Sequence, residues 1–413
     1  RFALATLFFG TQKNEEGVIW KDSTNWLSSS SVCRWYGVLC ERNDDVVDTG
    51  VDVVSIDLSE NGLTNHLPDE LGLLASYNNL IKLDLSDNAL RGKIPESLSL
   101  FTSLKELYLG PNFFTSTLPS SFGQLRSLTS LVVSDCLLTG ELPALTDLTN
   151  LNILALQNNA FTKKIPDLSG LPALTVLYLD GNVLHGTIPP LPLTLIDLRL
   201  GSNDLTGTVP YDIGHLLLLQ TCYLDNLQLS GEIPTSLGNL WLLHEIHIFN
   251  SGLEGRIPSE LSNLSLLRSC YFDSNKLTGP IPSTFGVTMT HLSHLYLFDN
   301  QLSREIPSSF GLMSNLSSLL LSNNNLSSTI PYALSILNHL TSLEFNNNSL
   351  IGTVPENFRT LSHLRRMLLH SNDLEGSIPT KVCQLTKYLL HTLTSDCDGD
   401  DPKVHCDCCS KCY

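Results

Sequence analysis

The sequence predicts an α/β fold, a right-handed solenoid of about fourteen coils with a parallel inner sheet and short 3-10 or helical return segments. Two observations carry this prediction. The template LxxLxLxxNxLxGxIP recurs through the middle of the chain at a dominant spacing of 24 residues, which is typical of repeat architectures. Hydrophobic residues make up 42% of the 413 residues but aromatic residues only 7%, so the core that the coils share is mostly aliphatic.

Each position of the template has a physical reason. The LxL segment is a short strand whose two Leu side chains face inward, so the residue between them faces outward. At the Asn position the chain turns inward, and an amide there can both donate to and accept from backbone groups that have lost water. This position falls at residues 61, 88, 112, 136, 159, 182, 203, 227, 251, 275, 300, 324, 348 and 372.

Three of these fourteen positions are not Asn: Cys136, Leu227 and Ser251. Cys is a known substitute at this position. At the other two, we expect the preceding residues, Asn226 and Asn250, to serve the Asn ladder after a small backbone shift. The Gly and Pro that follow fix the return path, because Gly permits backbone angles that a side chain forbids and Pro locks φ.

Charge and hydropathy exclude several classes of partner. Lys plus Arg number 24 and Asp plus Glu number 41, so the net charge is −17. This acidic excess repels phosphate backbones and anionic lipid, which excludes nucleic acid as a partner. No apolar run approaches the roughly 18 residues that span a bilayer, so we expect no direct membrane insertion of this chain. The apolar segment from Phe2 to Phe9 resembles the apolar part of a signal peptide, but a buried capping helix is favoured, because no small-residue cleavage site follows before the charged residues Lys13, Glu15 and Glu16.

The sequence predicts no catalytic residue, metal or cofactor. It contains no GxSxG, no HExxH, no phosphate-binding Gly loop and no kinase signature. His244, Glu245 and His247 form HExH, but on a strand Glu245 and His247 share a face that His244 does not. An exposed polar strand edge is therefore the favoured interpretation. A solvated loop is favoured over a calcium site for four acidic residues near the C-terminus: Asp396, Asp398, Asp400 and Asp401.

The candidate binding residues are outward positions of the inner sheet. The positions between the two strand Leu include Tyr178, Arg199, Tyr223, His247, Tyr271 and Tyr296. The positions two residues further along include Asp180, Asp225, Phe249, Asp273 and Phe298. Stacked strands place these aromatic rings in one stripe with carboxylates beside it. Exposed aromatics on a rigid sheet favour recognition of a glycan or a cationic peptide, and lateral packing of good strand residues is the alternative.

The LxGxIP form of the repeat resembles the plant-type extracellular leucine-rich repeat family, which includes receptor-like kinase ectodomains, receptor-like proteins and polygalacturonase-inhibiting proteins. The resemblance extends upstream through Trp20, Trp26 and VCRWYGVLC, which is similar to the N-terminal cap of that family. It implies a Cys33–Cys40 disulfide and a leucine-rich repeat solenoid with disulfide caps. The expected parts are an N-terminal cap over 1–52, the solenoid over 53–381 and a Cys-rich cap over 382–413.

The C-terminal segment is similar to the Cys-rich caps of secreted algal repeat proteins. Its six cysteines are Cys383, Cys397, Cys406, Cys408, Cys409 and Cys412. They allow fifteen pairings, so their connectivity stays open. A zinc site from the last four is the alternative, and disulfides are favoured because a secreted chain meets oxidant first. Cys222 and Cys270 lie two strands apart, about 10 Å, which is too far for a disulfide, so they are interpreted as buried thiols.

Glycosylation signals agree with an oxidising compartment. Four Asn-x-Ser/Thr triplets are candidate acceptors: Asn263, Asn315, Asn325 and Asn347. Together with the cysteines they predict a secreted, extracellular or cell-surface location.

The expected function is non-enzymatic extracellular recognition of a protein, peptide or glycan, as a receptor ectodomain or a soluble binder. One alternative is a structural or adhesive component of the cell surface or matrix that self-associates. Another is an inhibitor of a secreted glycan-degrading enzyme.

Overall fold

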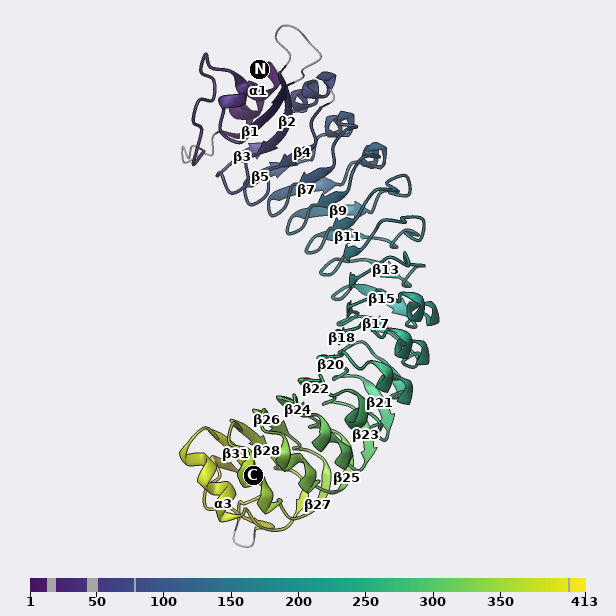
Figure 1. Cartoon of the computed structure of the whole chain (residues 1–413), viewed down its shortest axis with the longest axis vertical. Helices are drawn as coiled ribbons and strands as arrows, with labels where there is room; N and C mark the ends of the chain where they lie inside the picture. The colour runs from purple at the N-terminus through teal and green to yellow at the C-terminus, as the bar shows by residue number, and fades with distance from the viewer. Residues whose placement is uncertain (13–19, 43–50, 78, 400–401) are drawn as a thin grey trace. The chain divides into compact units, whose positions relative to one another are not determined.

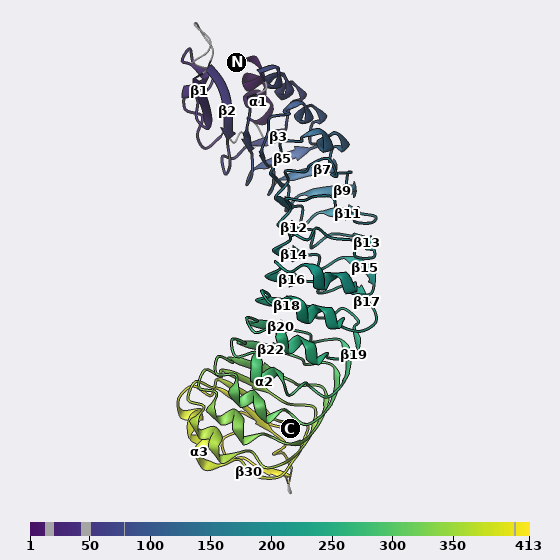
Figure 2. The ribbon, with the colours of Figure 1, turned by 45° about the vertical axis from the view of Figure 1, so that its right-hand side comes forward.

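The computed structural model describes residues 1–12, 20–42, 51–77, 79–399 and 402–413. The chain forms two compact units, Arg1–Leu205 and Thr206–Tyr413. Within each unit the coils carry a strand at one end, and many of them carry a helical turn at the opposite end (Figures 1 and 2). The face of these strands that points away from the core is called the strand face below.

In the first unit, the strand face is built by parallel strands that pair in register from β2 onward. β1 is antiparallel to β2 and belongs to the N-terminal cap. The strands are β1 (Val38–Arg42), β2 (Val51–Asp57), β4 (Lys82–Asp84), β6 (Glu106–Tyr108), β8 (Ser130–Val132), β10 (Ile153–Ala155), β12 (Val176–Tyr178) and β14 (Asp197–Arg199).

In the second unit the corresponding strands are also parallel and in register. They are β16 (Thr221–Tyr223), β18 (Glu245–His247), β20 (Ser269–Tyr271), β22 (His294–Tyr296), β24 (Ser318–Leu320), β26 (Ser342–Glu344), β28 (Arg366–Leu368), β31 (Thr392–Ser395) and β33 (Lys411–Cys412). β31 pairs with β28, and β33 pairs with β31. The parallel sheet thus continues into the Cys-rich segment, beyond the last repeat of the template.

Short strands that follow the Asn position form further parallel sheets, which the template alone did not predict. In the first unit they are β3 (Thr64–His66), β5 (Ala89–Gly92), β7 (Phe113–Thr117), β9 (Leu137–Glu141), β11 (Ala160–Thr162), β13 (His185–Gly186) and β15 (Asp204–Gly207), which crosses the boundary. In the second they are β17 (Gln228–Leu229), β19 (Glu254–Arg256), β21 (Lys276–Gly279), β23 (Gln301–Arg304), β25 (Asn325–Thr329), β27 (Ser349–Gly352), β29 (Asp373–Leu374), β30 (Gly376–Ser377) and β32 (Val404–His405).

The return segments contain short helices, as the sequence predicts. In the first unit they are η2 (Asp69–Tyr77), η3 (Glu96–Leu100) and η4 (Ser120–Gln124), while α1 (Phe2–Thr11) and η1 (Val32–Arg34) belong to the N-terminal cap. In the second they are η5 (Tyr211–His215), η6 (Thr235–Asn239), η7 (Ser259–Asn263), α2 (Phe285–Thr288), η8 (Ser308–Leu312), η9 (Tyr332–Ile336), η10 (Glu356–Thr360), α3 (Thr380–Cys383) and η11 (Gln384–Lys387). Most 3-10 turns follow the Pro of the template, because Pro sets the extended angle from which the turn begins.

The core of each unit is a stack of template Leu side chains. Leu83, Leu107 and Leu131 are fully buried on successive strands of the first unit, and Leu295, Leu319 and Leu343 are their counterparts in the second. Burial of each contributes about 1.5–3 kcal/mol of hydrophobic free energy, and neighbouring coils supply the covering surface.

The Asn ladder satisfies backbone groups between coils. Asn324 Oδ1 accepts from the backbone N–H of Leu302 at 2.9 Å, in the preceding coil. Its Nδ2 donates to the carbonyl of Leu297, also in the preceding coil, at 2.9 Å and to the carbonyl of Leu321, in its own coil, at 3.1 Å. The same pattern recurs at Asn112 in the first unit. One amide therefore joins two coils, as its dual donor and acceptor character predicts.

Where Ser251 replaces Asn, the sequence-based expectation is wrong. Ser251 is fully buried, and its hydroxyl donates to the carbonyl of Leu224 at 2.7 Å, so it serves the ladder itself. Asn250 instead donates to the carboxamide oxygen of Asn226 at 2.9 Å on the surface. Both Asn226 and Asn250 have positive φ, a turn conformation that Asn tolerates well, and this turns their side chains away from the ladder.

The cysteines inside the repeats are buried thiols. Cys136 takes the ladder position, and its sulfur interacts with the backbone N–H groups of Asn112 and Phe114. Burial raises its pKa to about 11, so it stays a neutral thiol. Cys222 and Cys270 are buried outside any disulfide, as the strand spacing predicts.

The N-terminal cap is closed by aromatic packing and a disulfide. Cys33 and Cys40 are bonded, with their Cα atoms 5.5 Å apart. α1 confirms the expected capping helix: Leu4 and Leu7 are buried, and Phe8 packs on Trp20 with ring centroids 4.9 Å apart.

The C-terminal cap contains three disulfides. They are Cys383–Cys408, Cys397–Cys412 and Cys406–Cys409. Each cysteine of the alternative zinc site is therefore oxidised, which removes the thiolates that zinc requires. Asp396 accepts from the backbone N–H groups of Ser371 and Asn372, so this carboxylate extends the ladder by one coil. Asp400 and Asp401 lie outside the described residues.

Candidate functional site

Four rings on neighbouring strands of the second unit form a stacked column. The centroids of Tyr223 and His247 are 4.1 Å apart, those of His247 and Tyr271 4.2 Å, and those of Tyr271 and Tyr296 4.3 Å. The ring planes lie within 18° of parallel. These four residues are called the aromatic column below. The stripe predicted from strand alternation is thus brought together in β16 to β22.

Strand register explains the column. His247 pairs with Tyr223 on one side and Tyr271 on the other, and Tyr271 pairs with Tyr296. Parallel strands lie about 4.8 Å apart, which is close to the stacking distance of aromatic rings, so identical rotamers place ring on ring. Each such pair contributes about 0.5–1.5 kcal/mol beyond its buried area. Lateral packing, the alternative interpretation, is therefore present in the structure.

Stacking hides the ring faces and leaves edges and polar tips outward. The hydroxyl of Tyr223 donates to a carboxylate oxygen of Glu245. His294 meets Tyr271 and Tyr296 edge to face, with centroids 6.5 and 6.1 Å apart. Burial lowers the pKa of His294 and raises that of Tyr271, so both groups favour their neutral forms.

A second row lies beside the aromatic column and consists of Asp225, Phe249, Asp273 and Phe298. The Phe249 ring lies 6.4 Å from that of His247, and the Phe298 ring lies 6.4 Å from that of Tyr296, both tilted. Asp273 is only 7% exposed, and burial raises its pKa to about 6. Burial also raises the pKa of Asp225, whose carboxylate accepts from Asn226 Nδ2 at 2.9 Å.

The remaining candidates belong to the first unit and have other contacts. Tyr178 donates its hydroxyl hydrogen to Asp197 at 2.6 Å, and the Arg199 guanidinium lies over its ring at 4.5 Å. Arg199 and Asp197 form an ion pair at 3.3 Å. Burial, followed by this hydrogen bond, raises the pKa of Tyr178 to about 12. Asp180 is half-buried on the same face.

Three further residues shape these sites: sequence analysis placed Glu245 on the face of His247 without giving it a binding role, and it missed Asp197 and His294. All three are the first residues of their strands, two before the outward position between the strand Leu. Strand alternation puts them on the strand face as well, so the signal was available in the residue before the first inward Leu of each LxL segment.

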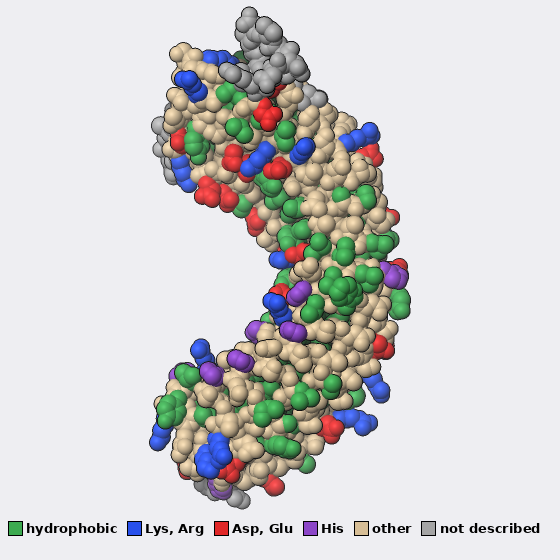
Figure 3. All heavy atoms as spheres, viewed as in Figure 1, with side chains coloured by type: hydrophobic (Ala, Val, Ile, Leu, Met, Phe, Trp, Pro, Cys, Tyr) green, Lys and Arg blue, Asp and Glu red, His purple; other side chains and the backbone are tan. Residues whose placement is uncertain are grey.

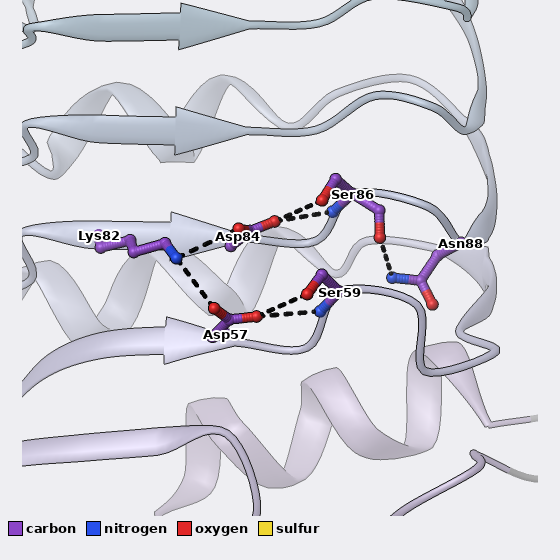
Figure 4. A network of polar contacts seen from close by, with 6 residues as sticks. All are labelled: Asp57, Ser59, Lys82, Asp84, Ser86 and Asn88. Atoms are coloured by element: carbon purple, nitrogen blue, oxygen red, sulfur yellow. Dashed lines mark hydrogen bonds and ion pairs between the residues drawn. The ribbon is translucent and has the colours of Figure 1, made fainter.

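A polar network occupies the strand face at the start of the first unit (Figure 4). Lys82 Nζ lies 2.9 Å from Asp57 and 3.3 Å from Asp84. Asp57 also accepts from the Ser59 hydroxyl at 2.8 Å, and Asp84 from the Ser86 hydroxyl at 2.6 Å. Burial opposes the charge on Asp57, but the bonds from Lys82 and Ser59 outweigh it and lower the pKa of this carboxyl.

The four candidate glycosylation residues are exposed side chains. Asn263 ends η7, and Asn315 donates to the carbonyl of Thr290 at 2.9 Å. Asn325 begins β25, and Asn347 donates to the carboxamide oxygen of Asn323. Glycan occupancy at each stays a prediction.

No helix among the described residues has the length and apolarity to cross a membrane.

Comparisons with known proteins match the repeat architecture. The Leucine Rich Repeat family model matches residues 79–101, 103–125, 291–313, 315–337 and 339–361. A comparison with curated proteins found no match.

Solved structures give longer matches. The receptor kinase HAESA of Arabidopsis, solved with the peptide hormone IDA and the co-receptor SERK1, is 33% identical over 95% of this chain and 68% of its own, with a TM-score of 0.78. A TDR receptor is 33% identical over 81% of this chain, with a TM-score of 0.76. The plant peptide hormone receptor RGFR1, solved with RGF2, is 28% identical over 84% of this chain and 63% of its own, with a TM-score of 0.67. This chain spans 58% of the TDR receptor chain. Its repeats, its capped parallel sheet and these matches together show that the chain belongs to the leucine-rich repeat family.

Proposed function

We propose that the chain is an extracellular, non-enzymatic recognition protein that binds a peptide or protein ligand on the strand face of its second unit. The observation that carries the proposal is the aromatic column with its adjacent row of Asp225, Phe249, Asp273 and Phe298. Tyr and Phe supply large contact area at small entropy cost, and the carboxylates add charge selectivity. The four disulfides support an oxidising compartment.

The geometry favours a peptide over a glycan. A sugar ring packs on an exposed aromatic face, whereas the parallel stacking at 4.1–4.3 Å covers the faces within the aromatic column. Ring edges carry partial positive charge and suit carbonyl oxygens, which an extended peptide presents at every residue. HAESA was solved with a peptide hormone, and RGFR1 is a peptide hormone receptor, which supports the same ligand class here.

The test is a selection from a phage-displayed library of random dodecapeptides on the wild-type protein. The selected peptides are then titrated against the double variant Tyr271→Ala with Phe249→Ala. The matched control is Tyr211→Ala with Trp241→Ala, two aromatic residues outside the inner strands that are 62% and 56% exposed. We expect at least a tenfold loss of affinity, about 1.4 kcal/mol, in the first double variant and little change in the control.

The proposal is wrong if the first double variant, melting at the same temperature as the control, binds the selected peptides with wild-type affinity. A glycan array probed with the same proteins tests the alternative ligand class. Glycan binding that depends on Tyr271 and Phe249, without peptide selection, would replace the peptide assignment.

A further inference from the structure

Phe249, Asp273 and Phe298 occupy equivalent positions on three neighbouring coils. The parallel pairing of β18, β20 and β22 continues past the strand ends. The backbone N–H of Asn250 donates to the carbonyl of Asp273 at 3.1 Å, and that of Ser274 donates to the carbonyl of Phe298 at 2.9 Å. A short acidic side chain therefore lies between two aromatic residues.

The spacing of the three coils matches a guanidinium or ammonium group. Adjacent strands lie about 4.8 Å apart, so the two Phe positions are separated by about 10 Å. A guanidinium or ammonium group midway would lie about 5 Å from each ring, within the roughly 6 Å reach of cation–π attraction. The ring planes of Phe249 and Phe298 are tilted by 49° and 51° from their neighbours in the aromatic column, so they are not part of its stack.

The carboxylate between the rings has no counter-ion in the part of the chain that the structure describes. Asp273 accepts from the Ser274 hydroxyl at 3.4 Å, and Asp299 nearby adds like charge. A buried, unpaired negative charge is costly, and a cation that reaches it relieves that cost.

We propose that Phe249, Asp273 and Phe298 form a cage for one basic group of the ligand, a guanidinium or an ammonium. This inference rests on the proposed function and narrows it to ligands that carry such a group. The two rings contact the cation from opposite sides, and the Asp273 carboxylate accepts its N–H hydrogens. These three residues are called the basic-group cage below.

The basic-group cage should make binding dependent on pH. A bound cation favours the carboxylate, so it lowers the pKa of Asp273 from its free value of about 6. Affinity is then constant above that pH and falls up to about tenfold per pH unit below it. Other titratable groups lie on the same strand face: Asp225, Glu245, His247, Tyr271, His294, Tyr296 and Asp299.

The chain carries histidines near this position and elsewhere on its surface (Figure 3), so the pH profile of the variant rather than that of the wild type decides. The probes are acetyl-Gly-Arg-Gly-amide, its citrulline analogue, which is uncharged, and free putrescine. Ligand-observed NMR gives their affinities between pH 5 and 8. The wild-type protein should bind the arginine peptide at least ten times more tightly than the citrulline peptide at pH 7.5.

Asp273→Asn should reduce that preference to less than twofold and flatten the pH profile. Phe249→Leu, which keeps an apolar side chain but removes the ring, should weaken the arginine peptide several-fold. The matched control is Asp299→Asn, because Asp299 is an exposed acid close to Asp273 but outside the basic-group cage. It should keep the preference and the pH profile.

The inference is overturned if Asp273→Asn, with an unchanged fold by circular dichroism, keeps the arginine preference. An equal loss in Asp299→Asn overturns it too, because diffuse acidity then explains the binding. Binding of either basic probe through Asp273 supports it, and the ratio of their affinities distinguishes a peptide side chain from a free amine.

Its failure is separable from failure of the proposed function. The basic-group cage alone is contradicted if the selected peptides need Tyr271 and Phe249 but the protein does not prefer the arginine peptide over the citrulline peptide. The proposed function alone is contradicted if the library yields no peptide but the protein prefers the arginine peptide and loses that preference in Asp273→Asn.

Discussion

On β2 and β4 of the first unit the outward strand residues are Asp57 and Asp84, and Lys82 lies within 3.3 Å of both. On β18 and β20 of the second unit the same positions are His247 and Tyr271, stacked at 4.2 Å. The backbone register is the same in both places. In the first unit the strand face supplies both charges of its ion pairs. In the second unit Asp273 is buried without a cation among the described residues, so that face is better suited to an external ligand.

The largest expected effect tests whether the Asn ladder stabilises both units equally. Asn112→Ala in the first unit and Asn324→Ala in the second should each lower the free energy of unfolding by about 1–3 kcal/mol, because each leaves buried backbone groups unsatisfied. Urea denaturation measures the loss, with exposed Asn338→Ala as control. A variant at either ladder position that is as stable as the control would contradict the ladder account for that unit.

The next effect depends on the pKa shifts of Asp273 and Asp57, which have opposite directions. The pKa of Asp273 is raised to about 6 in the folded protein, above the roughly 3.9 of an unfolded chain. The folded state therefore binds more protons between about pH 4 and 6, and stability falls as pH rises through that window. Asp273→Asn should be more stable than wild type by about 1–2 kcal/mol at pH 7 and equal to it near pH 4. A destabilised variant at pH 7 would show that Asp273 has a stabilising partner in the free protein.

The smallest effect is expected for Asp57→Asn in the first unit, which should lower stability at neutral pH where Asp273→Asn should raise it. The pKa of Asp57 is lowered, so its contribution to stability is present above about pH 4 and is lost as pH falls further. Because this ion pair is partly exposed, Asp57→Asn should cost at most about 1 kcal/mol at pH 7, and less in high salt. Thermal unfolding at low and high ionic strength measures it. A stabilising effect of this substitution would remove the contrast between the faces.

The repeat allowed much of the fold to be predicted from sequence, because its periodicity is strong and each template Leu must face the core. The buried Leu column, the Asn ladder, the helical returns and the aromatic column all follow from alternation and strand spacing. The small parallel sheets after the Asn position do not, since segments such as Gln228–Leu229 are too short to show a period of two.

Other features depend on contacts and burial in the folded chain, which the spacing of residues along the sequence does not determine. The six C-terminal cysteines have fifteen possible pairings, and only their positions in the fold select one. Ser251 takes its ladder position through a buried hydroxyl, and the sequence does not show whether a Ser hydroxyl is buried or exposed. Likewise Asp225 and Asp273 look alike in sequence, and only burial separates a half-buried acid from one that is 7% exposed.

Parallel rings at near-contact distance also have an optical consequence. The ultraviolet transitions of Tyr223, Tyr271 and Tyr296 lie in an ordered chiral array, so they should give this unit a near-ultraviolet circular dichroism signal of its own. Three of the four tryptophans, Trp20, Trp26 and Trp35, instead pack together in the N-terminal cap. The chain thus carries one ordered group of chromophores in its N-terminal cap and another at its candidate site, and each can report on its own surroundings without a label.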